Sequence, residues 1–208
     1  MRQGTHIITL DNGYHIWTHT EGQGDIKLLC LHGGPGGNHE NWENFGEELA
    51  DLGVEVTMYD QLGSFYSDQP DYSDPKIAEK YLTYDYYLEE LEELRQKLNY
   101  DNFYLIGQSW GGALAMMYAL KYGQHLKGLI ISSMVDNIDE YLEHINALRE
   151  KTLTHEAVAY MKECEAKNDL DNARYQGYVD VLNREYGDRK QPMAIRHMIQ
   201  TMATPAHK

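Results

Sequence analysis

The sequence predicts an α/β fold, in which a mostly parallel sheet is covered by helices on both faces and is followed by a helical cap. Two observations lead to this prediction. Short apolar runs typical of buried strands alternate with helical patterns as far as about residue 132. Beyond that point the chain shows polar amphipathic helices and no further apolar strand. We therefore expect a core at residues 1–135 and a helical cap at residues 136–208.

The first half of the core is expected to begin with a β-hairpin. The alternating runs His6–Leu10 and Tyr14–Thr20 flank an Asp-Asn-Gly turn, and Asn-Gly is typical of tight hairpin loops. The run IKLLCL is apolar almost throughout, which predicts a buried strand. A helix with Phe45, Leu49 and Leu52 on its apolar face follows it. We place this strand, this helix, a second strand and a Gly- and Pro-containing loop at residues 26–31, 42–52, 54–59 and 60–74.

The second half of the core is expected to contain two more helices and two more strands. A helix at Tyr84–Leu98 is predicted because apolar residues recur along it every three or four positions. Its acidic pairs, Glu89–Glu90 and Glu92–Glu93, are interpreted as parts of a solvated face. We place the next strand, helix and strand at residues 102–106, 112–122 and 126–132. The cap helices are expected at residues 141–150, 154–167 and 170–186.

Composition narrows the function classes. The formal net charge is -15, whereas nucleic acids and anionic membranes require a basic surface, so we expect neither as a partner. The two cysteines, Cys30 and Cys164, show neither metal-ligand spacing nor a disulfide framework, and no His-Glu-x-x-His motif occurs. We therefore expect no metal and no cofactor. The chain shows no signal peptide and no long apolar span, which favours a cytoplasmic protein.

The run Gly107-Gln108-Ser109-Trp110-Gly111 has the pattern G-x-S-x-G between a predicted strand and a predicted helix. This pattern is typical of a nucleophile elbow, a sharp turn that exposes the serine hydroxyl to a substrate. The pattern alone is weak evidence, but the strand before it and the helix after it strengthen the interpretation. Ser109 is therefore the candidate nucleophile of an acyl-transfer reaction.

A second motif, the glycine-rich run His32–Gly37 (HGGPGG), directly follows a predicted buried strand. Glycines leave backbone N–H groups open to a substrate, and such a loop supplies one oxyanion donor in proteins with a nucleophile elbow. We expect the N–H groups of Gly34 and Trp110 to be the two donors. The run does not fit G-x-G-x-x-G and no P-loop motif occurs, so we do not expect nucleotide binding. His32 precedes the serine and is interpreted as structural.

A third motif, Tyr59–Pro70 (YDQLGSFYSDQP), leaves the end of a predicted strand, where ligands bind in open α/β sheets. Asp60 precedes the serine, whereas the acid of an elbow-type triad follows it, so Asp60 is interpreted as a residue that holds the loop. Together, HGGPGG, DQLGS-x-YSDQP and GQSWGG resemble the proline iminopeptidases (prolyl aminopeptidases) of the α/β-hydrolase superfamily. The resemblance covers about residues 5–135 well and continues loosely through the cap.

The resemblance implies an α/β-hydrolase-type sheet and a serine hydrolase that releases an N-terminal residue, preferably proline, from a peptide with a free N-terminus. It implies Ser109 as nucleophile and Gly34 and Trp110 as oxyanion donors. Phe65 departs from the family pattern, because many relatives carry glycine there, and we expect a modest effect on loop shape. In the family, two more core strands after the cap carry the triad aspartate and histidine. We expect this chain to be a C-terminally truncated member that lacks these last core strands.

Neither a triad acid nor a triad histidine is evident after Ser109. Asp136 is interpreted as a residue at the entry to the cap, and the histidines as solvated or packed in the cap; they are His125, His144, His155, His197 and His207. We therefore expect slow turnover, if any, from this chain alone. The strand at 126–132 would be an apolar sheet edge, through which the chain could associate with itself.

Two other interpretations stay open. An esterase, a lactonase or an amidase can use the same scaffold, because a fold does not fix a substrate. The chain could instead be a non-catalytic remnant that binds a peptide or a partner chain. A substrate panel separates the peptidase from the other hydrolases. Covalent labelling of Ser109 separates the remnant from the peptidase, because a serine without a base should not react.

Overall fold

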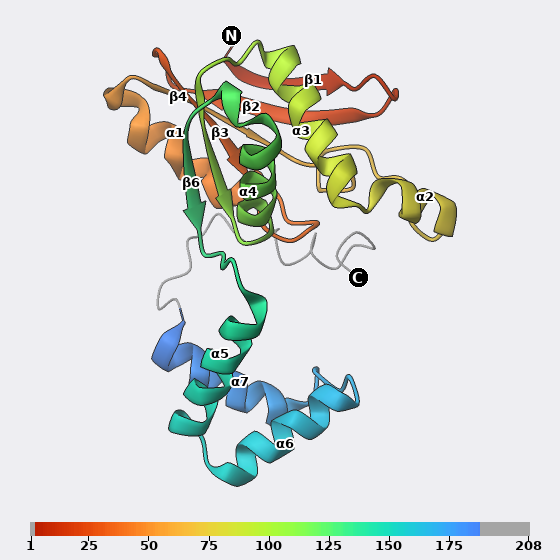
Figure 1. Cartoon of the computed structure of the whole chain (residues 1–208), viewed down its shortest axis with the longest axis vertical. Coiled ribbons are helices and arrows are strands. Elements are labelled where there is room, and N and C mark those ends of the chain that lie inside the picture. The colour runs from red at the N-terminus through yellow and green to blue at the C-terminus, as the bar shows by residue number, and fades with distance from the viewer. Residues whose placement is uncertain (1–2, 188–208) are drawn as a thin grey trace. The chain divides into compact units, whose positions relative to one another are not determined.

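The computed structural model describes residues 3–187, which form two compact units that divide after Met134 (Figure 1). The first unit holds a six-stranded sheet with the strand order β1-β2-β4-β3-β5-β6. Its strands are β1 (Gly4–Thr9), β2 (His15–Glu21), β3 (Ile26–Leu31), β4 (Val54–Tyr59), β5 (Phe103–Gln108) and β6 (Leu126–Ser132). The β1–β2 hairpin is antiparallel and joins β4, whereas β4, β3, β5 and β6 are parallel. The predicted mostly parallel α/β sheet is confirmed.

Helices cover both faces of this sheet. The first-unit helices are η1 (His39–Trp42), α1 (Glu43–Leu49), η2 (Ala50–Leu52), α2 (Pro75–Tyr81), α3 (Tyr84–Leu98), α4 (Trp110–Tyr122) and η3 (Gly123–His125). Side chains of β3 alternate between two cores, as expected of a central strand. Leu29 and Leu31 pack with α3 and α4, whereas Leu28 and Cys30 pack with Trp42 near α1 (Figure 1).

The structure corrects three details of the sequence prediction. The helix expected at 42–52 is divided into η1, α1 and η2, and Leu52 is 67% exposed rather than on an apolar face. Glu90 and Glu92 of α3 are buried, although they were expected on a solvated face. Helix α2 was not predicted from the sequence. The Asp74 side chain caps it by accepting from the Lys76 N–H, and a proline occupies its first turn.

The second unit contains α5 (Ile138–Thr152), α6 (His155–Ala166) and α7 (Ala173–Tyr186). Each helix begins after an Asn or Thr whose side chain accepts from a backbone N–H of the first turn. A small core of Met161, Cys164 and Tyr175 lies between α6 and α7. Residues 188–208 of the predicted cap lie outside the described residues. Within the described part of the chain, no helix has the length and apolar character needed to cross a membrane.

Candidate active site

Ser109 lies between the end of β5 and the first residue of α4, in a backbone conformation that non-glycine residues rarely adopt. Its φ is 53° and its ψ is −120°. Such strain persists only where the surrounding structure enforces it, and it often marks a functional position. The turn therefore has the backbone geometry that the G-x-S-x-G pattern predicts for an exposed nucleophile.

The two glycines of the motif explain how the turn is enforced. A Cβ atom on Gly107 would lie 2.1 Å from the carbonyl oxygen of Gly111. A Cβ atom on Gly111 would lie 2.4 Å from the carbonyl oxygen of Leu31 and 2.6 Å from that of His32. These neighbours are backbone atoms that cannot move aside, so glycine is required at both positions. The elbow is thus pressed against the end of β3.

Backbone hydrogen bonds fix Ser109 and leave its hydroxyl unused by the helix. The Ser109 N–H donates to the carbonyl oxygen of Ser132 at the end of β6, at 2.9 Å. The Ser109 carbonyl oxygen accepts from the N–H groups of Gly112 and Ala113. The side chain caps no N–H group of α4, although serine is a common capping residue. The half-buried hydroxyl is therefore free to face a substrate.

The glycine-rich loop lies beside this turn. Leu31 pairs with Gly107 in the parallel register, so the segments after β3 and β5 leave the sheet at the same edge. A Cβ atom on Gly33 would lie 2.3 Å from Oε1 of Gln108, next to the serine. Gly34 has a φ of 127°, and a Cβ atom there would lie 2.6 Å from the backbone nitrogens of Gly36 and Gly37. The structure thus brings the loop of Gly34 and the turn of Ser109 together.

Trp110, the second predicted donor, is the first residue of α4. Its backbone N–H points away from the helix and has no acceptor within it, as at every helix start. Its indole Nε1–H donates to Oε1 of Gln61 at 3.0 Å, and its rings pack against Tyr84 and Tyr87. This anchoring holds the first turn of α4, and with it the N–H that follows the serine.

Two buried groups hold the neighbouring loops. Nε2 of His32 accepts from the Gln61 N–H, and Nδ1 of His32 lies 2.8 Å from the Gly33 carbonyl oxygen, which assigns the proton to Nδ1. Burial lowers the pKa of His32 and favours this neutral form. The Asp60 carboxylate accepts from the N–H groups of His39 and Tyr66. Both side chains thus hold the backbone of the loops beside the elbow.

Glu90 is a functional candidate that the sequence interpretation missed. Its side chain is 2% exposed, and its carboxyl group accepts from the Leu62 N–H. Burial raises the pKa of Glu90 to about 8, so the group is largely protonated at neutral pH. The neighbouring Gln61 binds the Trp110 indole, so Glu90 supports the loop that positions α4. The sequence did contain a signal for its burial. Glu90 lies three residues after Tyr87 and four before Leu94, so it is on the same buried face of α3.

The structure assigns none of the candidates for a triad acid or base to Ser109. His125 precedes β6, and its Nδ1 lies 3.5 Å from Asp101, at the opposite end of the sheet from Ser109. Asp136, His144 and His155 belong to the second unit, whose position relative to the core is not determined. His197 and His207 lie outside the described residues. Residues 3–187 also contain no group of three His, Cys, Asp or Glu side chains suited to a metal ion.

The sheet order and the elbow define a class of protein, and the sequence comparison agrees with it. Residues 27–204 match the family described as alpha/beta hydrolase fold, and the chain belongs to this family. Its relatives narrow the resemblance. The chain is 42% identical over 172 residues to the proline iminopeptidase of Elizabethkingia meningoseptica, with 81% of this chain and 55% of the relative covered. It is 43% identical over 152 residues to that of Flavobacterium johnsoniae, with 72% and 49% covered.

A solved structure shows the same fold. The crystal structure of Mycobacterium smegmatis proline iminopeptidase superposes with a TM-score of 0.83 at 22% identity, covering 98% of this chain and 69% of that chain. The resemblance to proline iminopeptidases that the three motifs indicate is thereby confirmed. The chain spans about half the length of the curated relatives it matches.

Proposed function

We propose that Ser109 is the nucleophile of a serine hydrolase that releases an N-terminal residue, preferably proline, from peptides with a free N-terminus. The observation that carries this proposal is the strained turn at Ser109, whose hydroxyl is free beside the loop of Gly34. The names of the relatives support the substrate class.

The geometry suggests how the reaction proceeds. Oγ of Ser109 attacks the carbonyl carbon of the first peptide bond, and the developing oxyanion accepts hydrogen bonds from the N–H groups of Gly34 and Trp110. The C–N bond of that peptide bond then breaks, and the shortened peptide leaves as an amine that takes up the proton lost by the serine hydroxyl. Water hydrolyses the acyl-enzyme, which releases the N-terminal residue and restores the hydroxyl. The start of α4 places the positive end of the helix dipole next to the oxyanion.

The hydroxyl proton requires a base, and within the described residues no hydrogen bond joins the Ser109 hydroxyl to a histidine. Loss of a general base lowers turnover by orders of magnitude and leaves the contribution of the oxyanion donors and binding. We therefore expect the 208-residue chain alone to hydrolyse proline anilides slowly. A panel of anilides, esters and lactones compares the peptidase with the other hydrolase activities that this scaffold supports.

Covalent labelling tests the nucleophile directly. The chain, Ser109→Ala and Ser132→Ala are incubated with an organophosphonate, and their intact masses are measured. Ser132→Ala is the matched control, because it removes a nearby hydroxyl but keeps the carbonyl that accepts from Ser109. One adduct on the parent chain and on Ser132→Ala, with none on Ser109→Ala, would identify Ser109 as an activated nucleophile. An adduct that persists on Ser109→Ala would refute the assignment, whereas no adduct on any folded protein would favour a non-catalytic chain.

A further inference from the structure

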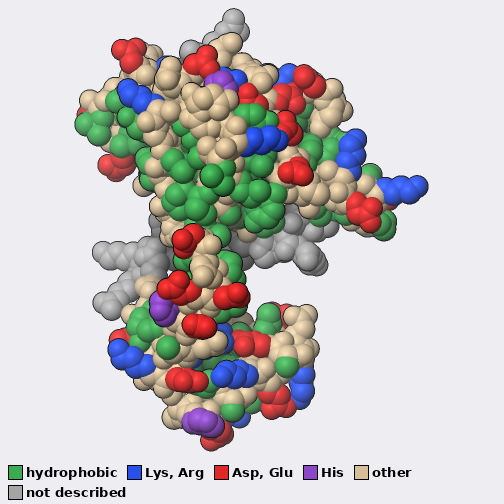
Figure 2. Space-filling model, in the orientation of Figure 1, with side chains coloured by type: hydrophobic (Ala, Val, Ile, Leu, Met, Phe, Trp, Pro, Cys, Tyr) green, Lys and Arg blue, Asp and Glu red, His purple; other side chains and the backbone are tan. Residues whose placement is uncertain are grey.

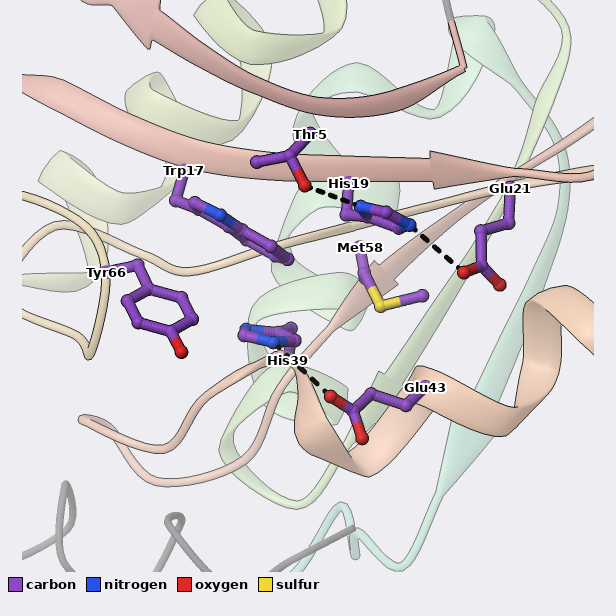
Figure 3. A pocket seen from close by; sticks show the side chains of 8 residues that line it. All are labelled: Thr5, Trp17, His19, Glu21, His39, Glu43, Met58 and Tyr66. Carbon is purple, nitrogen blue, oxygen red and sulfur yellow. Dashed lines mark hydrogen bonds and ion pairs between the residues drawn. The ribbon is translucent and has the colours of Figure 1, made fainter.

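A pocket lies on the α1 face of the core, between β2, β4 and the start of α1 (Figure 3). Its volume is about 370 Å³, which is within the range of small-molecule sites. None of its lining residues belongs to the elbow or the glycine-rich loop. The pocket is thus separate from the groups assigned to the proposed hydrolase reaction.

Aromatic rings form one side of this pocket. The rings of Trp17 and His39 stack with their centroids 4.0 Å apart, and the ring of Tyr66 stacks on His39 at 5.7 Å. Figure 3 shows Trp17, His39 and Tyr66 gathered on one side, with Met58 on the floor. Aromatic faces attract organic cations, and tryptophan attracts them most strongly.

Glu43 offers carboxylate oxygens to the pocket beside His39. The His39 side chain is 6% exposed, and its Nδ1 lies 2.9 Å from the Asp60 carboxylate, which holds the ring in place. Oε1 of Glu43 lies 3.7 Å from Nε2 of His39, too far for a hydrogen bond between them. The half-exposed Glu43 carboxylate can therefore accept from an N–H donor placed in the pocket.

A second carboxylate, Glu21, faces the same pocket from the end of β2 (Figure 3). Its Oε1 lies 3.0 Å from Nε2 of His19, and Nδ1 of His19 lies 2.8 Å from the Thr5 hydroxyl, so His19 holds the Glu21 carboxylate at the edge of the pocket. No Lys or Arg lines the pocket. Its two carboxylates thus face aromatic rings without a neighbouring Lys or Arg.

We propose that this pocket binds an organic ammonium ion, namely a protonated primary or secondary amine on a small apolar body. The ammonium group donates to the carboxylates of Glu43 and Glu21, and the carbon body lies against Trp17 and Tyr66. The acceptors favour an amine with N–H groups over a quaternary ammonium ion, which has no donor. The aromatic wall favours an organic cation over a metal ion, in line with the absence of a suited ligand cluster among residues 3–187.

The test uses benzylammonium as the probe and benzyl alcohol as its neutral counterpart. The ¹⁵N-labelled chain is titrated with each, and the indole N–H signals are followed by NMR after assignment with Trp→Phe variants. We expect the Trp17 signal to shift in a saturable way with benzylammonium and not with benzyl alcohol. An unchanged signal at Trp42, which is buried in the core near α1, reports that the fold is retained.

Matched variants decide whether the carboxylates carry the affinity. Glu21→Gln/Glu43→Gln should weaken benzylammonium binding about tenfold, because a charge-assisted contact is lost. Glu47→Gln/Glu48→Gln has the same net charge, and its exposed positions on α1 do not line the pocket, so its affinity should not change. If the double variant fails to fold, Glu43→Gln alone serves, since its side chain is half exposed. Equal affinity in all variants, an unmoved Trp17 signal or an equal shift with benzyl alcohol would overturn the proposal without bearing on Ser109.

Discussion

Strands β5 and β6 are neighbours in one parallel sheet and are both apolar, yet their environments differ. In β5, Phe103 and Leu105 are fully buried, because β3 and β6 flank the strand and helices cover it. In β6, the consecutive residues Leu129, Ile130 and Ile131 are 36–44% exposed. Figure 2 shows hydrophobic side chains gathered over β6 and α4. The comparison teaches that an apolar run makes a strand suitable for burial, whereas the neighbouring strands and helices decide whether its side chains are buried.

The sequence of β6 resembles that of an interior strand. Successive residues of a strand point to opposite faces, so three consecutive apolar residues offer apolar surface on both. Within residues 3–187, β6 pairs with β5 on one side and has no partner strand on the other. Such an edge is a template for pairing with another strand. Ser109 follows β5 but is linked to β6, because its N–H donates to the carbonyl oxygen of Ser132 at the end of β6.

The largest expected difference between the two strands concerns their glycines. Gly107→Ala in β5 should reduce the free energy of unfolding by about 4 kcal/mol, because its Cβ meets a backbone oxygen that cannot yield. Gly128→Ala in β6 should cost about 1 kcal/mol, since its Cβ meets only the movable ring of Tyr104. Urea unfolding measures both values. Equal costs would contradict the view that the elbow is the tighter of the two regions.

Truncation of one apolar side chain in each strand sharpens the comparison. Leu105→Ala should cost about 3 kcal/mol of unfolding free energy, because it leaves a cavity in a fully buried position. Ile130→Ala should cost about 1 kcal/mol or less, since water already reaches much of the side chain. The same unfolding measurement applies. A cost at Ile130 as large as that at Leu105 would mean that β6 is covered in solution.

The stability of the core that covers β5 should depend on pH, because Glu90 of α3 is buried in it. Its pKa is raised from 4.5 to about 8, so the folded state holds a proton that the unfolded state releases. This contribution to stability is complete below pH 4.5 and is lost as the pH rises through 8. Glu90→Gln cannot ionise, so it should nearly match the parent chain at pH 5 and exceed its unfolding free energy by several kcal/mol at pH 9. A difference that does not change with pH would refute the raised pKa.

The smallest effect on stability is expected from charges on the exposed edge. Leu129→Lys/Ile131→Lys should change the unfolding free energy by about 1 kcal/mol or less, but should reduce self-association of the chain through β6. Ile7→Lys is the matched control, because Ile7 is a 57% exposed apolar residue on the opposite edge strand, β1. Sedimentation at several concentrations measures association. A parent chain that stays monomeric throughout would contradict this prediction.

Local sequence patterns predicted the elements whose residues interact within their own segment. The apolar spacing of Tyr84–Leu98 gave both ends of α3, and the apolar runs gave both ends of β3, β4 and β6. The elbow followed from five residues, of which Gly107 is required by a contact across the turn itself and Gly111 by the backbone at the end of β3. The alternation of strands and helices predicted a mostly parallel sheet, but it did not predict the order of the strands in that sheet.

Features that depend on distant segments could not be predicted in this way. The burial of Glu90 depends on the Leu62 N–H, which is remote in sequence. The burial of Glu92 depends on Arg95 and Tyr118, which bind both of its oxygens. The proposed ammonium pocket combines residues of β1, β2, β4, η1, α1 and the loop after β4, and no single motif contains them all. Such groups acquire their surroundings only when the sheet brings remote segments together.

The hydrogen bond from the Ser109 N–H to Ser132 makes one amide proton a reporter on both strands. That proton exchanges with solvent only when the end of β6 separates from the elbow, so its exchange rate measures the free energy of this local opening. A ligand or partner that covers β6 would slow the exchange at Ser109 without touching the serine. The reactivity of the hydroxyl and the fraying of a neighbouring strand would then be read from one residue.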